Sequence, residues 1–174
     1  MRTRIPLIRS QAELIALVAV VAIAAGAALG FWQHAERPRA SFVALSGGNF
    51  TTDDLRGRVV LVNFWATSCV TCVAEMPKMT DTWRKYAPHG YEMVAVAMRY
   101  DHPNAVAEFA RREALPFRVA LDSDGAVAAA FGHVSVTPTT YLLDRSGRIV
   151  ARYVGEPNWQ ELQARVERAL AKPA

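Results

Sequence analysis

The chain contains, at residues 63–75, the stretch Asn63-Phe64-Trp65-Ala66-Thr67-Ser68-Cys69-Val70-Thr71-Cys72-Val73-Ala74-Glu75. This stretch holds the only two cysteines of the protein, and it follows a run of apolar, strand-forming residues. If residues 59–64 form a buried strand and residues 70–79 a helix, Cys69 lies at the helix N-terminus, where unpaired N–H groups and the macrodipole favour a thiolate. Cys72 then lies one turn further along, on the same face. This position predicts a pair of reactive thiols.

Two cysteines at this spacing also fit half of a zinc site or two inert buried side chains. Zinc needs four ligands, and the chain offers no second cysteine pair and only four scattered histidines. A structural disulfide gains little stability from closing so short a loop. We therefore interpret the pair as a redox couple and predict neither a metal nor a dissociable cofactor.

The N-terminal segment is predicted to anchor the protein in a membrane. Residues 14–32 carry no charge and are long enough to cross about 30 Å of hydrocarbon, whereas the apolar core of a signal peptide has about 7–15 residues. The arginines of residues 1–13 favour a cytoplasmic N-terminus. A cleaved signal peptide is the alternative, because residues 25–27 form a small-residue pattern that a signal peptidase accepts. Either way the cysteines leave the cytoplasm for a compartment in which disulfides persist.

The rest of the chain predicts one α/β domain, residues 41–174, after a polar linker at residues 33–40. The near-continuous apolar run of residues 59–64 indicates a strand buried on both faces, as in a mixed or parallel sheet covered by helices. Asp101 or Asn104 is expected to cap a helix. The net charge is +4, but no basic stripe with interleaved aromatic residues predicts a nucleic-acid partner. Further strands are expected at residues 42–45, 91–98, 117–121, 140–143 and 149–154, and the last helix from about residue 158.

Three separated segments together resemble a known family. They are residues 55–67, the pattern Cys69-x-x-Cys72-x-x-Glu75-x-Pro77, and residues 137–144 with the sequence Thr-Pro-Thr-Thr-Tyr-Leu-Leu-Asp. In this order they resemble the membrane-anchored thiol-disulfide oxidoreductases of the TlpA and ResA type, within the thioredoxin superfamily. The likeness runs from about residue 41 to residue 171. It implies a thioredoxin-like fold, with a central mixed sheet flanked by helices and preceded by one N-terminal transmembrane helix.

The cysteines and one carboxylate are the predicted catalytic residues. Cys69, at the helix start, is expected to form the mixed disulfide with a partner protein, and Cys72 to resolve it. Glu75 lies three residues after Cys72 on the same helical side, although a charged helix residue is normally solvated. The resemblance implies a buried acid at this position that controls thiol protonation, and thioredoxin has a buried aspartate where this chain has Asn63. We therefore expect desolvation to raise the pKa of Glu75.

Three further residues are predicted to contact the substrate or to shape its site. Trp65 is expected to pack beside the disulfide, with a plain core position as the alternative. The Thr137–Pro138 bond would be trans by the general preference of such bonds. The resemblance instead implies a cis bond opposite the cysteines, with the backbone of Thr137 available to an extended substrate segment. Pro77 is expected to have a structural role, and His133 to lie in a surface loop.

The resemblance implies an extracytoplasmic reductase of protein disulfides, of the kind that prepares apocytochromes or copper proteins for their metal. Its electron donor would be a membrane carrier of the DsbD or CcdA kind, and its location a bacterial inner membrane, single-pass, with a periplasmic catalytic domain. A periplasmic disulfide oxidase or isomerase uses the same residues. A copper(I) metallochaperone with the two thiolates as ligands is the alternative from another class. A pure binding module is disfavoured because both cysteines are present.

Overall fold

The computed structural model describes Ile15, residues 18–20 and residues 37–173. The chain divides into two units, residues 1–36 and 37–174, and the second is the domain described below. The predicted cytoplasmic segment 1–13, most of the predicted membrane helix 14–32 and residues 33–36 of the linker lie outside the described residues. Within the described part of the chain, no helix is both long enough and apolar enough to cross a membrane.

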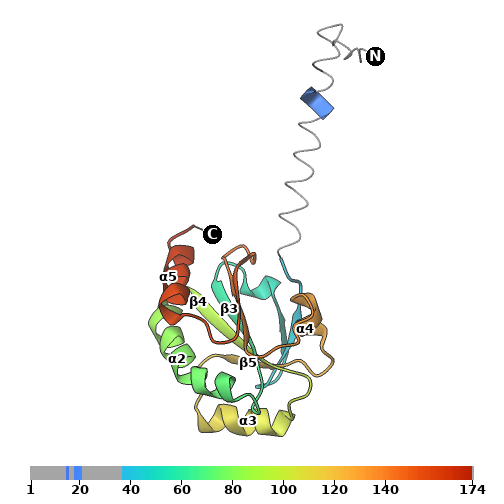
Figure 1. The fold of residues 1–174 in the computed structure, drawn as a ribbon, viewed down its shortest axis with the longest axis vertical. Coiled ribbons are helices and arrows are strands. Elements are labelled where there is room, and N and C mark those ends of the chain that lie inside the picture. Colours follow the sequence, from blue (N-terminus) through green and yellow to red (C-terminus); the bar gives the residue numbers. More distant parts are fainter. Residues whose placement is uncertain (1–14, 16–17, 21–36, 174) are drawn as a thin grey trace, which may run out of the picture. The chain divides into compact units, whose positions relative to one another are not determined.

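In chain order, the helices and strands of the domain are β1 (Ser41–Ala44), β2 (Asn49–Thr51), the 3₁₀ turn η1 (Asp53–Leu55), β3 (Val59–Trp65), α2 (Val70–Tyr86), the 3₁₀ turn η2 (Ala87–His89), β4 (Tyr91–Ala97), α3 (Pro103–Arg112), β5 (Arg118–Leu121), α4 (Ala126–Ala130), β6 (Thr139–Leu143), β7 (Ile149–Val154) and α5 (Trp159–Leu170). From β3 to β6 strands and helices alternate along the domain, whereas β1–β2 and β6–β7 are consecutive strands (Figure 1).

Residues 37–173 form a seven-stranded mixed sheet with the order β2-β1-β5-β4-β3-β6-β7. β3 lies inside it and pairs in parallel with β4 and antiparallel with β6. β4 continues in parallel to β5, whereas β7 closes one end of the sheet as an antiparallel partner of β6. All residues of β3 and β4 are buried, as the apolar run of residues 59–64 predicted.

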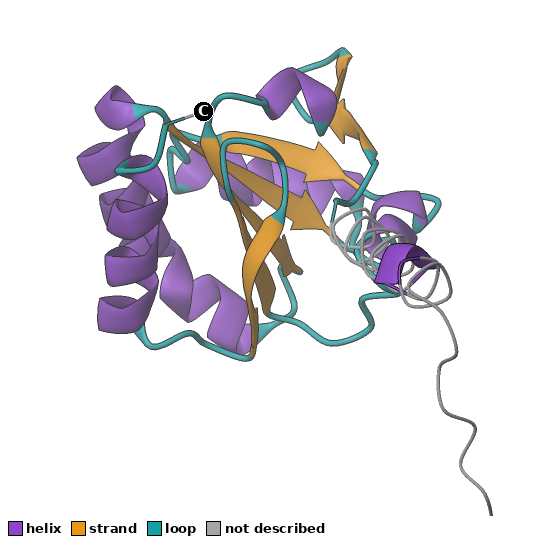
Figure 2. Cartoon of the chain, turned by 90° about the horizontal axis from the view of Figure 1, so that it is seen from above, coloured by secondary structure: helices purple, strands orange, loops and turns teal. Residues whose placement is uncertain are grey.

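Alternate residues of β3 pack into two separate apolar cores. Leu61 and Trp65 face α2, α3 and α5, whereas Val62 and Phe64 face α4 and η1. Figure 2 shows helices on both sides of the sheet. The predicted α/β architecture, a mixed sheet flanked by helices, is therefore confirmed for the domain.

Three local features differ from the predictions. α2 continues through Pro77 to Tyr86, beyond the predicted end at residue 79, because its second half also buries Met79 and Tyr86 in the core. β2 was not predicted; it is a three-residue strand that pairs with β1. The predicted caps of α3 are wrong: His102 caps it, with its side chain accepting the Asn104 N–H.

The buried carboxylate of Asp122 is expected to stabilise the start of α4. It is 2% exposed and accepts the Val127 and Ala128 N–H groups, both at 2.9 Å. Asp122→Ala leaves these buried donors unpaired, so we expect the free energy of unfolding in urea to fall by about 1–3 kcal/mol. Asp124→Ala is the matched control, because exposed Asp124 accepts only the Ala126 N–H, and it should change the free energy by no more than about 0.5 kcal/mol. Equal effects of the two variants would contradict this role.

Candidate active site

The two cysteines form a disulfide at the start of α2. Cys69 is the N-cap residue and is half-buried, whereas Cys72 lies inside the first turn and is fully buried. The Cys72 N–H donates to the Cys69 sulfur at 3.2 Å. Cys69 is therefore the more accessible sulfur, as predicted, and it already accepts one N–H of the helix terminus. Val70, which lies between the two cysteines in the sequence, is 84% exposed.

The Glu75 carboxyl lies one turn beyond Cys72 and is only 1% exposed. Asn63 Nδ2 donates to Glu75 Oε1 at 3.1 Å and to Thr140 Oγ1 at 2.9 Å. Burial raises the pKa of Glu75 to about 7, although the bond from Asn63 lowers it. Across space, Glu156 raises this pKa and Lys78 lowers it. The predicted burial of Glu75 and the predicted rise of its pKa are both confirmed.

Two buried oxygens of this network have no protein partner within the described residues. They are Oδ1 of Asn63 and Oε2 of Glu75. An ionised Glu75 therefore has only one hydrogen bond to replace its hydration, which is the physical reason for the raised pKa. A carboxyl that titrates near neutral pH, one turn from a cysteine, suits the transfer of a proton to or from that cysteine.

The Thr137–Pro138 peptide bond is cis, as the resemblance implied. Thr139 pairs with Phe64, so Pro138 lies at the end of β3 from which the loop to Cys69 departs. Pro138 is buried and Thr137 half-buried. The Pro138 carbonyl accepts the Gly155 N–H at 2.8 Å, and the Thr137 hydroxyl lies 3.3 Å from the hydroxyl of Tyr100.

Trp65 lies in the apolar core, in the cluster that also contains Cys72 and against which Cys69 packs. Its side chain is fully buried and belongs to the same apolar cluster as Cys72, and its ring centroid lies 5.1 Å from that of Phe109. Trp65 therefore offers no surface to a substrate in this structure. His133 is exposed in the loop after α4, as predicted, and has a positive φ of 58°.

Two contributions to the site could not be found from the sequence pattern. Asn63 Nδ2 donates to both Thr140 and Glu75. In the sequence, Thr140 differs from its surroundings only as a polar residue inside a strand that was expected to be buried. Asp101 was expected to cap a helix, yet its carboxylate accepts both the N–H and the hydroxyl of Thr67, each at 2.6 Å. Both contacts join residues far apart in sequence.

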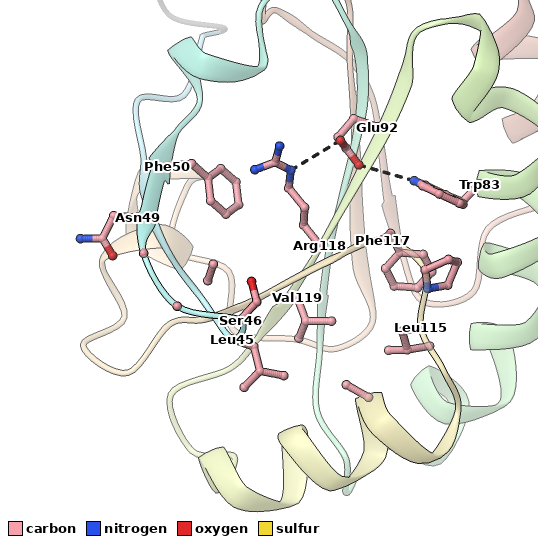
Figure 3. A pocket seen from close by; sticks show the side chains of 15 residues that line it. Leu45, Ser46, Asn49, Phe50, Trp83, Glu92, Leu115, Phe117, Arg118 and Val119 are labelled. Carbon is pink, nitrogen blue, oxygen red and sulfur yellow. Dashed lines mark hydrogen bonds and ion pairs between the residues drawn. The ribbon is translucent and has the colours of Figure 1, made fainter.

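No other feature of the described residues competes with this site. Within them, no three His, Cys, Asp or Glu side chains are gathered so as to hold a metal ion. A separate hollow of about 500 Å³ lies between the β1–β2 turn and the end of α3. Figure 3 shows Arg118 and Trp83 directed at Glu92 in its wall. None of the predicted site residues lines this hollow.

Fold and site together define a class: a thioredoxin-fold oxidoreductase whose cysteine pair begins a helix at the end of the sheet where a cis-proline precedes β6. The chain belongs to the Redoxin family, which matches residues 34–170. It is a thiol-disulfide oxidoreductase of the ResA type. It is 33% identical over 128 residues to thiol-disulfide oxidoreductase ResA of Bacillus thuringiensis, which covers 74% of this chain and 73% of that protein.

Solved structures agree with this assignment. A thioredoxin from Neisseria meningitidis, described as putative, has a TM-score of 0.72 and 38% identity over 76% of this chain and 88% of its own. A thiol:disulfide interchange protein DsbE from Chlorobium tepidum, also described as putative, has a TM-score of 0.71 and 28% identity, over 78% of this chain and 96% of its own.

The pKa of Glu75 predicts how the stability of the oxidised protein depends on pH. Because this pKa is about 7 in the folded protein, against an ordinary value of 4.5 for a solvated glutamate, the folded state binds the proton more tightly. The contribution to stability is fully present below about pH 4.5, falls as the pH rises towards 7 and is lost above it. The loss is on the order of 3 kcal/mol.

Glu75→Gln removes this titration and keeps a side-chain oxygen for Asn63. Urea unfolding of the oxidised protein and of this variant between pH 4 and 8 provides the comparison. We expect the difference in unfolding free energy between the wild type and Glu75→Gln to change by on the order of 3 kcal/mol over this range. The wild type should lose this stability as the pH rises. Parallel curves over this range would contradict the raised pKa.

Proposed function

We propose that this oxidoreductase reduces disulfides of client proteins outside the cytoplasm, using the Cys69–Cys72 couple. The observation that carries the proposal is the buried Glu75 carboxyl, one turn below Cys72 and bonded to Asn63. Cys69 is the more accessible sulfur and accepts the Cys72 N–H. A nucleophile at the surface and a proton acceptor in the core suit the two successive steps of thiol–disulfide exchange.

In the reductive direction, the Cys69 thiolate attacks one sulfur of the client disulfide. The S–S bond of the client breaks, a mixed disulfide forms and the first client thiolate leaves. The Cys72 thiol then transfers its proton to the Glu75 carboxylate and attacks Cys69. This step releases the second client thiolate and forms the Cys69–Cys72 disulfide. The client gains two electrons and the enzyme loses two.

Client binding is assigned to the loop before β6. Pro138 has no N–H, but the backbone of half-buried Thr137 lies at the same end of the sheet as Cys69. In this proposal an extended client segment pairs with that backbone, as in strand addition. Trp65 supports the site from within the core and does not touch the client, because its side chain is fully buried.

The proposed location is the periplasmic side of a bacterial inner membrane. The uncharged stretch of residues 14–32, with arginines before it, supports one membrane-spanning helix with a cytoplasmic N-terminus. Cytochrome c or copper-protein precursors are the proposed clients. The oxidised enzyme needs two electrons and two protons for each cycle, and a membrane carrier of the DsbD or CcdA kind is the proposed source.

The reduction potential tests the reductive direction. We expect the fragment of residues 33–174, equilibrated with glutathione or thioredoxin and analysed by thiol trapping, to have a potential at or below about −270 mV, the value of thioredoxin. A potential near about −120 mV would identify an oxidase instead. The absence of a reversible couple, together with copper that copurifies only while Cys69 is present, would support the metallochaperone.

The Glu75 carboxyl is expected to accelerate the exchange itself. Glu75→Gln removes the proton acceptor, so we expect reduction of a protein disulfide near pH 7 to slow by about 10²-fold, the low end of the range for general acid–base catalysis. Asp81→Asn is the matched control, because Asp81 is an exposed carboxylate on the same helix, and its rate should equal that of the wild type. An unchanged rate in the Glu75 variant would remove this residue from the mechanism.

A further inference from the structure

Beyond the ends of β3 and β4, one carboxylate joins two loops. The Met98 N–H donates to the Trp65 carbonyl at 3.0 Å, and after this bond the two chains continue as loops. There the Thr67 N–H donates to Asp101 Oδ2, and the Thr67 hydroxyl donates to Asp101 Oδ1, each at 2.6 Å. Hydrogen bonds to an ionised acceptor are shorter and stronger than neutral ones. This pair of bonds therefore holds the two loops together.

Thr67 belongs to the turn that ends at Cys69. The Cys69 N–H donates to the Ala66 carbonyl at 3.1 Å, so residues 66–69 form a closed turn with Thr67 as its second residue. Asp101 is itself fixed, because its N–H donates to the Met98 carbonyl at 2.8 Å and its Oδ1 accepts the His102 N–H at 3.0 Å. The restrained Asp101 carboxylate therefore holds the turn of residues 66–69, which ends at Cys69.

The two hydrogen bonds between Thr67 and Asp101 matter more for the position of Cys69 once the disulfide is reduced. In the oxidised protein the disulfide also restrains the Cys69 sulfur. Reduction removes that covalent restraint. The backbone of Cys69 is then held on one side by the Val73 N–H, which donates to its carbonyl at 3.0 Å, and on the other by the turn, while its sulfur keeps the N–H of Cys72. Because helix N–H groups stabilise a thiolate only when it lies against them, the position of the turn then determines the reactivity of Cys69.

We propose that Asp101 is a positioning residue for the exchange reaction, which keeps the Cys69 sulfur at the start of α2 after the disulfide opens. The inference concerns the chemistry of the cysteine pair in either direction, so it stands whether the enzyme is a reductase or an oxidase. The charged groups on the α2 side of the pair are Glu75 and, acting on its carboxyl, Lys78 and Glu156. Tyr100 and His102 are the sequence neighbours of Asp101. Arg99 packs against Gly125 instead.

Position and charge have opposite effects on the Cys69 thiol. Removal of a nearby negative charge alone lowers the pKa of a thiol, because the thiolate is then repelled less. Release of the sulfur from the helix terminus raises its pKa towards the ordinary value of about 8.5. The sign of the change in an Asp101 variant therefore distinguishes loss of positioning from loss of charge.

The experiment measures the rate at which the Cys69 thiolate displaces iodide from iodoacetamide in the reduced full-length protein. The rate is followed against pH, at Cys69 alone, by peptide mass spectrometry. For Asp101→Ala we expect the pKa of Cys69 to rise by about half a unit to one unit, which slows alkylation about three- to tenfold at a pH well below that pKa. Thr67→Val removes one of the two bonds without changing the charge, so we expect a smaller rise.

Glu108→Gln on α3 is the control for charge, because it removes an exposed carboxylate from the neighbouring helix, and it should leave the pKa of Cys69 unchanged. A fall in this pKa in Asp101→Ala, or no change, would overturn the proposal. If Asp101→Ala does not fold, the test rests on Thr67→Val, which keeps the Asp101 carboxylate and the hydrogen bond from the Thr67 N–H. An unchanged pKa of Cys69 in Thr67→Val would then overturn the positioning role of Asp101.

Discussion

The burial of β3 on both faces is the constraint on which the site depends. Its neighbours β4 and β6 take up its backbone hydrogen bonds on the two sides, and its side chains alternate between two apolar cores. A slip of one residue would exchange the two sets of side chains and turn Asn63 away from Glu75. The fixed register of β3 therefore fixes the amide that meets the buried carboxyl, and also the point from which the cysteine loop departs.

Within this frame, the site tolerates an incompletely bonded carboxyl. Glu75 accepts one hydrogen bond, from an amide that it shares with Thr140. A second donor would hold the group ionised at neutral pH and lower its affinity for a proton. An apolar residue in its place would pack well but could not exchange a proton. The arrangement lies between these limits, as is common where active sites give up stability for chemistry.

Much of the fold and the centre of the site follow from local sequence patterns. The apolar run of residues 59–64 predicted the buried strand, and the cysteine spacing after it predicted a pair on one face of a helix. The cis bond at Pro138 came from resemblance and not from any local pattern. The hydrogen bonds from Thr67 to Asp101 were not predicted, because an aspartate before a helix most often caps that helix. Only the tertiary structure brings Thr67 to the Asp101 carboxylate. The three-residue strand β2 is too short to show a periodicity.

The order of the strands leaves β2 and β7 at the two edges of the sheet. Open edges present unpaired backbone groups to which other extended chains can add. Here β2 has only three residues, and β7 carries the exposed Arg152 between exposed Val150 and Val154. Short and charged edge strands discourage such pairing. The shortness of β2 and the charge on β7 thus work against edge-to-edge pairing, which matters for a protein whose proposed clients approach it as extended segments.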